Sequence, residues 1–184
     1  MREGKLTDTT WYFRLFYVPI LNMLISMALF RIMNAKRMTS IGPGTSWALV
    51  YFIGLTVWCV LMWFVPFSLN VAFWIGICIM IFGQVIFALG YSAMREHPEK
   101  NKLVVDWGIY KFSRHSHVLA GKVTTLGAIA MGWNWNSRMY VILWLYFVLD
   151  IIVTHFGVLN EEKINREKFG PEYEDYMKRV PRYL

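Results

Sequence analysis

Five apolar runs, separated by polar stretches, constrain the fold of this chain more than any other feature. They lie at residues 13–33, 46–67, 71–93, 115–134 and 137–158. Each is close to the roughly 20 residues that an α-helix needs to cross about 30 Å of hydrocarbon. Hydrophobic residues make up 57% of the chain, more than is typical of a water-soluble domain. The sequence therefore predicts an all-α integral membrane protein with about five transmembrane helices.

The runs leave no room for a separate soluble domain, so we expect residues 1–184 to form one membrane domain with a cytoplasmic tail at 159–184. The first run has no small-residue cleavage site behind it and is interpreted as a retained span. The fourth run carries Lys122 but is also rich in small residues. Small residues allow close approach of helices in a membrane, which favours a span here too.

The distribution of Lys and Arg predicts the orientation. With five spans, fourteen of these residues fall on one side and four on the other, and Lys122 stays inside a run. Because cytoplasmic loops carry the excess of cations, the C-terminus is expected in the cytoplasm and the N-terminus outside. With four spans this bias would largely disappear. The membrane would be the plasma membrane in a prokaryote and the endoplasmic reticulum in a eukaryote.

The net charge of +7 does not indicate nucleic-acid binding, because the cations flank apolar runs and form no basic domain. Attraction to anionic lipid head groups explains them more simply. Cys59 and Cys78 both lie within runs and lack CxxC spacing. Neither a disulfide framework nor a metal site is expected.

Two polar segments are long enough to build a cytoplasmic site: the connection before the fourth run and the tail after the fifth. On a helix, Asp150 and Glu161 return to nearly the same face, as do His155 and Glu162. Ionisable groups at membrane depth normally face the protein interior or a wet cavity. The alternative is that the glutamates are solvated at a helix end and that Asp150 pairs with a cation.

The connection contributes the sequence "GIYKFSRHSH" at 108–117. Gly108 can supply a turn, Tyr110 can line a pocket, and Arg114, His115 and His117 bring cationic or donor groups. Each has a structural alternative, such as an arginine anchored at the interface or a histidine satisfied in the core. Their clustering opposite two glutamates favours a site. Lys122 lies seven residues after His115, so it either extends that pocket or reaches back to the membrane surface.

These two segments carry a resemblance to a known family. "EE" at 161–162 followed by "FGPEYEDYMKRVP" at 169–181 resembles the C-terminal signature of the isoprenylcysteine carboxyl methyltransferases. These belong to a wider group of membrane methyltransferases that includes the phospholipid N-methyltransferases. "LVVDWGIYKFSRH" at 103–115 resembles the family's other signature, in which Gly-Ile-Tyr is followed by Arg-His-Pro-x-Tyr-x-Gly. The chain departs from it in having Ser116 and Val118 in place of Pro and Tyr, and Ala120 in place of Gly unless a one-residue shift makes Gly121 the match.

The resemblance implies that S-adenosylmethionine binds at the cytoplasmic face and that a lipid or lipidated acceptor enters from the bilayer. By this comparison the catalytic candidates are Glu162 and Arg114, the latter orienting the acceptor. The tail motif would fold as a short helix closing over the cofactor. The implied cofactor-binding residues are Gly108, Tyr110, His115, His117, Glu161, Glu162 and Tyr173.

The residue chemistry suits this cofactor. The two glutamates can accept hydrogen bonds from its ammonium and ribose hydroxyls, and the Arg-His segment can donate to its carboxylate. The acceptor stays open between an isoprenylcysteine carboxylate and a phospholipid amine, and the sequence does not address the oligomeric state. Two other functions stay open as well. The altered "RHSHVLA" allows a non-catalytic membrane scaffold, and sterol reductases share a related tail but are much longer.

Overall fold

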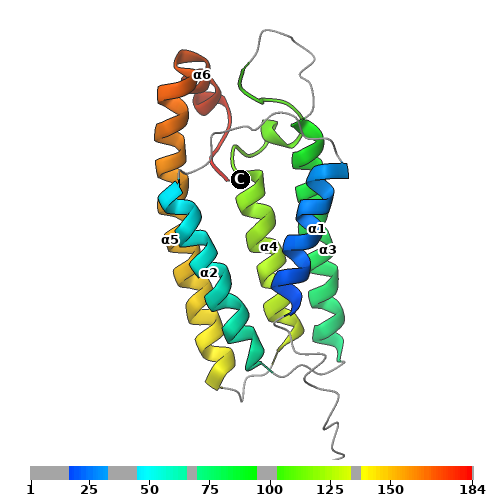
Figure 1. Ribbon diagram of the computed structural model, residues 1–184. Helices are drawn as coiled ribbons and strands as arrows, with labels where there is room; N and C mark the ends of the chain where they lie inside the picture. The colour runs from blue at the N-terminus through cyan, green and yellow to red at the C-terminus, as the bar shows by residue number, and fades with distance from the viewer. Residues whose placement is uncertain (1–16, 33–44, 66–69, 95–102, 134–137, 184) are drawn as a thin grey trace, which may run out of the picture.

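The computed structural model describes residues 17–32, 45–65, 70–94, 103–133 and 138–183 (Figure 1). Every regular element in these ranges is a helix, which confirms the all-α prediction for them. In chain order the elements are α1 (Tyr17–Ile32), α2 (Thr45–Trp63), α3 (Val71–Ala93), the 3₁₀ helix η1 (Gly108–Lys111), α4 (Ser116–Met131), α5 (Arg138–Phe169) and α6 (Pro171–Arg179). The predicted outer N-terminal segment and the 134–137 connection lie outside the described residues.

Helices α1 to α5 fall on the five apolar runs of the sequence. Within the described part of the chain, α3 and α5 are both long and apolar enough to cross a membrane. Helix α1 and residues 49–63 of α2 are shorter apolar helices. Helix α5 has 32 residues, which corresponds to about 48 Å. It therefore continues well past residue 158, where the hydropathy of the sequence places the end of the span.

Helices α3 and α4 make the most extensive contact in the bundle, and glycines allow it. A Cβ atom at Gly76 would lie 2.5 Å from the backbone oxygen of Gly127, and one at Gly83 would lie 2.9 Å from the Thr124 nitrogen. The two backbones approach too closely for side chains at these positions. This agrees with the close packing expected from the small residues of the fourth run.

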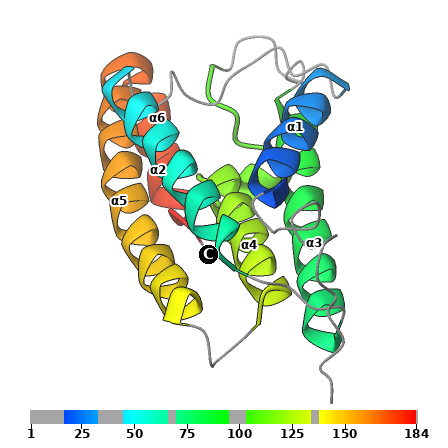
Figure 2. The same cartoon turned by 60° about the horizontal axis from the view of Figure 1, so that its bottom comes forward.

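Helix α1 lies against α3, and α2 lies against α5 (Figures 1 and 2). Polar contacts join the first pair, because the hydroxyls of Ser26 and Tyr91 are 2.7 Å apart and the Gln84 amide donates to Asn22. In the second pair the Tyr146 hydroxyl donates to the Gly54 carbonyl at 2.6 Å. A buried cluster joins α2, α4 and α5 below the site and includes Trp58, Met62, Ile129, Leu143 and Phe147.

A charge pair joins α4 to α5 inside the bundle. The Lys122 ammonium contacts the Asp150 carboxylate and lies 2.7 Å from the Thr154 hydroxyl. This confirms the alternative in which Asp150 pairs with a cation. Lys122 therefore directs its charge at α5, and it also lines the groove between α4 and α5.

Two glycines make the turns around the site. Gly108 opens η1 with a φ of 60°, and Gly170 separates α5 from α6 with a φ of 56°. Both values lie in the left-handed region, which glycine adopts without steric cost. Pro171 then starts α6, where its missing N–H is not needed. The tail motif thus forms the short helix that the resemblance implies.

Candidate functional site

The two polar segments meet at the end of the bundle where α3 and α5 end and α4 begins (Figure 1). Helix α6 folds back onto the connection that precedes α4. The Glu172 carboxylate accepts hydrogen bonds from the backbone nitrogens of Leu103 and Val104 at 3.0 and 2.9 Å. The Tyr176 hydroxyl donates to the Tyr110 carbonyl at 2.9 Å. The sequence segments that carry the resemblance are therefore assembled into one unit.

Glu162 is the centre of this unit and is only 2% exposed. Its Oε1 atom lies 3.0 Å from the Arg114 guanidinium and 3.3 Å from His115 Nε2. Arg182 donates two hydrogen bonds to the same carboxylate, from Nε at 3.1 Å and from Nη2 at 2.8 Å. Such a two-pronged arginine contact fixes orientation as well as charge. We call Arg114, His115, Glu162 and Arg182 the carboxylate cluster.

Backbone contacts hold the cluster closed. The nitrogens of Arg114 and His115 donate to the carbonyls of Pro181 and Arg182, at 3.1 and 3.2 Å. Arg114 also donates from Nη1 to the Met177 carbonyl at 3.0 Å. The chain after α6 thus runs beside the Arg-His segment. Its hydrogen bonds to the Arg-His segment and to Glu162 tie it to the start of α4 and to α5.

The charges of the cluster decide the ionisation of Glu162, which lies beyond the predicted end of the fifth span. Burial alone would raise its pKa, but the contacts with His115 and Arg182 and the nearby Arg114 charge outweigh burial. The pKa is lowered to about 2. Glu162 is therefore a carboxylate at neutral pH, and its charge is shared among cationic neighbours rather than solvated.

The other candidates divide between two sides of the start of α4. Tyr110 and His117 face α3, where the tyrosine hydroxyl lies 2.6 Å from His117 Nδ1 and the His117 ring packs beside Tyr91. Tyr173 is buried under α6, and burial raises its pKa. Glu161 is half-buried next to the cluster. The structure therefore brings Arg114, His115 and Glu162 together, with Tyr110 and His117 behind them.

The two predicted polar faces of α5 have different partners from those expected. His155 shares a helical face with Glu162, but its Nδ1 atom lies 3.0 Å from the Tyr183 hydroxyl. Asp150 is held by Lys122, on another helix, rather than acting with Glu161. Arg182 and Tyr183 were not candidates from the sequence. The only signal for them was their place in "VPRYL", directly after the tail motif.

An apolar groove of about 430 Å³ runs between α4 and α5 as far as Tyr183, the residue after Arg182 of the cluster. Its walls include Val118, Leu119, Ile151 and Phe156. Tyr183 lies at the groove, with its ring 6.5 Å from that of His115. The groove therefore joins the apolar flank of the bundle to the charged end.

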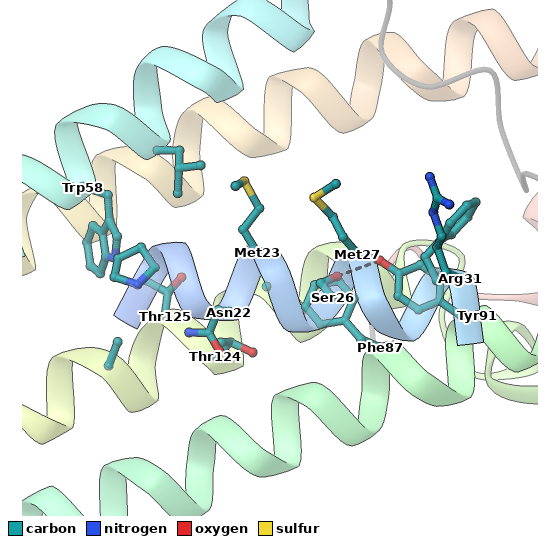
Figure 3. Close-up of a pocket in the computed structure, with 15 residues that line it drawn as sticks. Asn22, Met23, Ser26, Met27, Arg31, Trp58, Phe87, Tyr91, Thr124 and Thr125 are labelled. Carbon is teal, nitrogen blue, oxygen red and sulfur yellow. Dashed lines mark hydrogen bonds between the residues drawn. The ribbon is translucent and has the colours of Figure 1, made fainter. Parts of the chain in front are cut away.

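A second, larger cavity of about 570 Å³ lies among α1, α2, α3 and α4. Figure 3 shows Arg31 and Tyr91 at one end and Trp58 at the other. It touches a different face of α4 from the groove, through Gly121, Thr124 and Thr125. The rings of Tyr91 and His117 have their centres 5.0 Å apart, so its upper end adjoins the Tyr110–His117 pair.

Fold and site together define an all-helical protein with a buried carboxylate cluster at one end of an apolar bundle. The chain belongs to the DUF1295 family, described as proteins of unknown function, which matches residues 3–180. No curated protein and no solved structure matches the chain.

Proposed function

We propose that this protein is an integral membrane enzyme that transfers a methyl group from S-adenosylmethionine to a lipophilic acceptor. The observation that carries the proposal is the assembly of the two signature-like segments, 103–117 and 161–181, around one buried carboxylate. Two long apolar helices, α3 and α5, support a membrane location. The apolar groove that ends beside the cluster supports an acceptor drawn from the bilayer.

The residues present fit the cofactor's functional groups. Arg114 Nε is buried and has no hydrogen-bond partner among the described residues. Buried donors without partners are costly, so they favour a bound acceptor such as the cofactor's carboxylate. Glu161 supplies a carboxylate outside the cluster for the ammonium or ribose. Glu162, whose oxygens already face two arginines, holds Arg114 and His115 in position.

Proximity provides the main catalytic effect. When bound, the cofactor supplies a methyl group on a positively charged sulfur. Transfer to an amine spreads that charge, and transfer to a carboxylate cancels it, so a carboxylate directly on the sulfur would stabilise the ground state more than the transition state. Glu162 does not contact the sulfur in this way, because the other residues of the cluster engage its carboxylate. The apolar walls of the groove then hold the acceptor in line with the methyl–sulfur bond. Well-oriented reactants of this kind reach effective molarities of about 10⁵ M or more.

Calorimetry with S-adenosylhomocysteine tests cofactor binding. Glu161→Gln replaces a charged acceptor by a neutral one, so we expect affinity to fall about tenfold or more. Glu174→Gln, on the exposed side of α6, is the matched control and should bind like the parent. Glu172 is unsuitable as a control because it caps the 103–104 backbone. If the parent does not bind at high micromolar concentration, the protein is a non-catalytic scaffold instead, as the altered "RHSHVLA" segment allows.

A further inference from the structure

None of the four residues of the carboxylate cluster lines the 570 Å³ cavity. The cavity and the groove are lined by different residues of α4. The volume of the cavity lies within the roughly 300–1,000 Å³ typical of small-molecule sites. The proposed methyl transfer does not explain an open cavity of this size among the helices.

The lining of the cavity is amphipathic along its length. Met23, Met27, Leu55 and Trp58 provide apolar walls between α1 and α2. Methionine is flexible and polarisable, so such walls adapt to chains of different shape. Two polar side chains of the lining satisfy each other through the Ser26–Tyr91 hydrogen bond drawn in Figure 3, while the Thr124 hydroxyl is buried with no hydrogen-bond partner among the described residues. The apolar walls therefore suit a hydrocarbon chain.

Among the described residues that line the cavity, Arg31 is the one charged side chain and none is a carboxylate. In the described part of the chain no acidic residue forms an ion pair with it. It stands at the end of α1 that lies on the same side of the bundle as the carboxylate cluster (Figure 1). A guanidinium there can bind a carboxylate or phosphate with two parallel hydrogen bonds.

We propose that this cavity binds an anionic amphiphile, with its acid group at Arg31 and its apolar chain along the α1–α2 wall toward Trp58. Arg31 at one end of the cavity and Trp58 at the other correspond to the charged head and the apolar tail of such a molecule (Figure 3). The inference rests on the proposed membrane location, which provides the amphiphile, and does not require methyl transfer.

Equilibrium binding of labelled oleate and labelled phosphatidylglycerol to the purified protein in a non-ionic detergent tests the site. The neutral comparison is a labelled diacylglycerol. Arg31→Gln should weaken binding of the acidic probe about tenfold or more, the loss expected for hydrogen bonds to a charged group. Arg31→Lys should recover part of it. Lys163→Gln removes an exposed cation on α5 beside the carboxylate cluster and should change nothing.

A second variant tests binding of the ligand's apolar chain rather than of its acid group. Gly121 lines the cavity, and a Cβ atom there would meet only Phe87, at 3.9 Å. Gly121→Leu should therefore fill the cavity and reduce binding of acidic and neutral probes alike. Tighter binding of oleate assigns a carboxylate ligand, and tighter binding of phosphatidylglycerol assigns a phosphodiester. The proposal is overturned if the parent binds the acidic and neutral probes equally, or if Arg31→Gln binds the acidic probe as tightly as the parent.

Discussion

Glu162 is buried yet ionised, because Arg114, His115 and Arg182 surround its two oxygens. Removing a buried charge's partner usually costs more than the pair contributes, since the remaining charge is left without compensation. The side chains of the cluster therefore depend on one another. Glu162 thus fixes the positions from which Arg114 and His115 would contact a ligand.

The ionisation of Glu162 predicts a specific loss of stability in acid. Its pKa is about 2 in the fold, against an ordinary value of 4.5. A carboxyl whose pKa is lowered by folding contributes stability above its unfolded pKa and loses it as the pH falls toward the folded pKa. The melting temperature of the parent in detergent should therefore fall more steeply below about pH 4.5 than that of Glu162→Gln. Parallel profiles for the two proteins would show that the cluster does not stabilise the carboxylate.

Part of this cluster is predictable from the sequence, and the remaining residues are not, for a physical reason. Arg114, His115 and Glu162 lie in two polar segments that had to share one end of the bundle if the spans alternate. Arg182 and Tyr183 come after the tail motif, and no periodicity indicates where a short segment after a helix turns. Their position depends on backbone hydrogen bonds to residues almost 70 positions earlier, which local patterns do not reveal.

At the scale of elements, the α3–α4 contact depends on glycines whose effects can be separated. An alanine Cβ at Gly127 would lie 2.7 Å from both the Gly76 oxygen and the Met80 nitrogen. Because these are backbone atoms, the helices must move apart, and Gly127→Ala should lower the free energy of unfolding by about 1–3 kcal/mol. Gly121→Ala on the same helix meets only Phe87 and is the control. Denaturant titration in detergent measures both, and equal stability would contradict the packing described.

The Lys122–Asp150 pair makes a second prediction about how elements are joined. Lys122→Met leaves the Asp150 carboxylate without its cation inside an apolar region, which should destabilise the protein by about 2–3 kcal/mol. Adding Asp150→Leu removes the orphaned charge and should restore most of the stability. The unfolding free energies of the parent, both single variants and the double variant form the test. A double variant less stable than Lys122→Met would mean that the pair is not the main partner of either group.

The positions of α1 to α5 could be predicted because each apolar run has its own helix. The length of α5 could not, since its polar continuation from 159 to 169 looks like a tail in hydropathy. The side-chain faces were also partly wrong. A helical wheel shows that His155 and Glu162 share a face, but it does not show which neighbouring element covers each turn of that face. Tyr183 contacts His155, whereas Arg114 contacts Glu162.

For the whole molecule, the alternation of helices places the carboxylate cluster and Arg31 at one end of the bundle (Figure 1). The excess of Lys and Arg predicts that this end faces the cytoplasm. A tag on the C-terminus should therefore be protected from a membrane-impermeant reagent in intact cells and become reactive after the membrane is opened. Reaction in intact cells would place the proposed cofactor site on the wrong side of the membrane for a cytoplasmic methyl donor.

The central claim is that the cluster and the groove serve methyl transfer to a lipophilic acceptor. Purified protein in lipid vesicles is incubated with a total lipid extract and S-adenosylmethionine carrying a labelled methyl group. The parent and Glu174→Gln should transfer label to an organic-soluble product, and Glu161→Gln should transfer about tenfold less at limiting cofactor concentration. No label above that of protein-free vesicles, from a preparation with a cooperative melting transition, would contradict the claim.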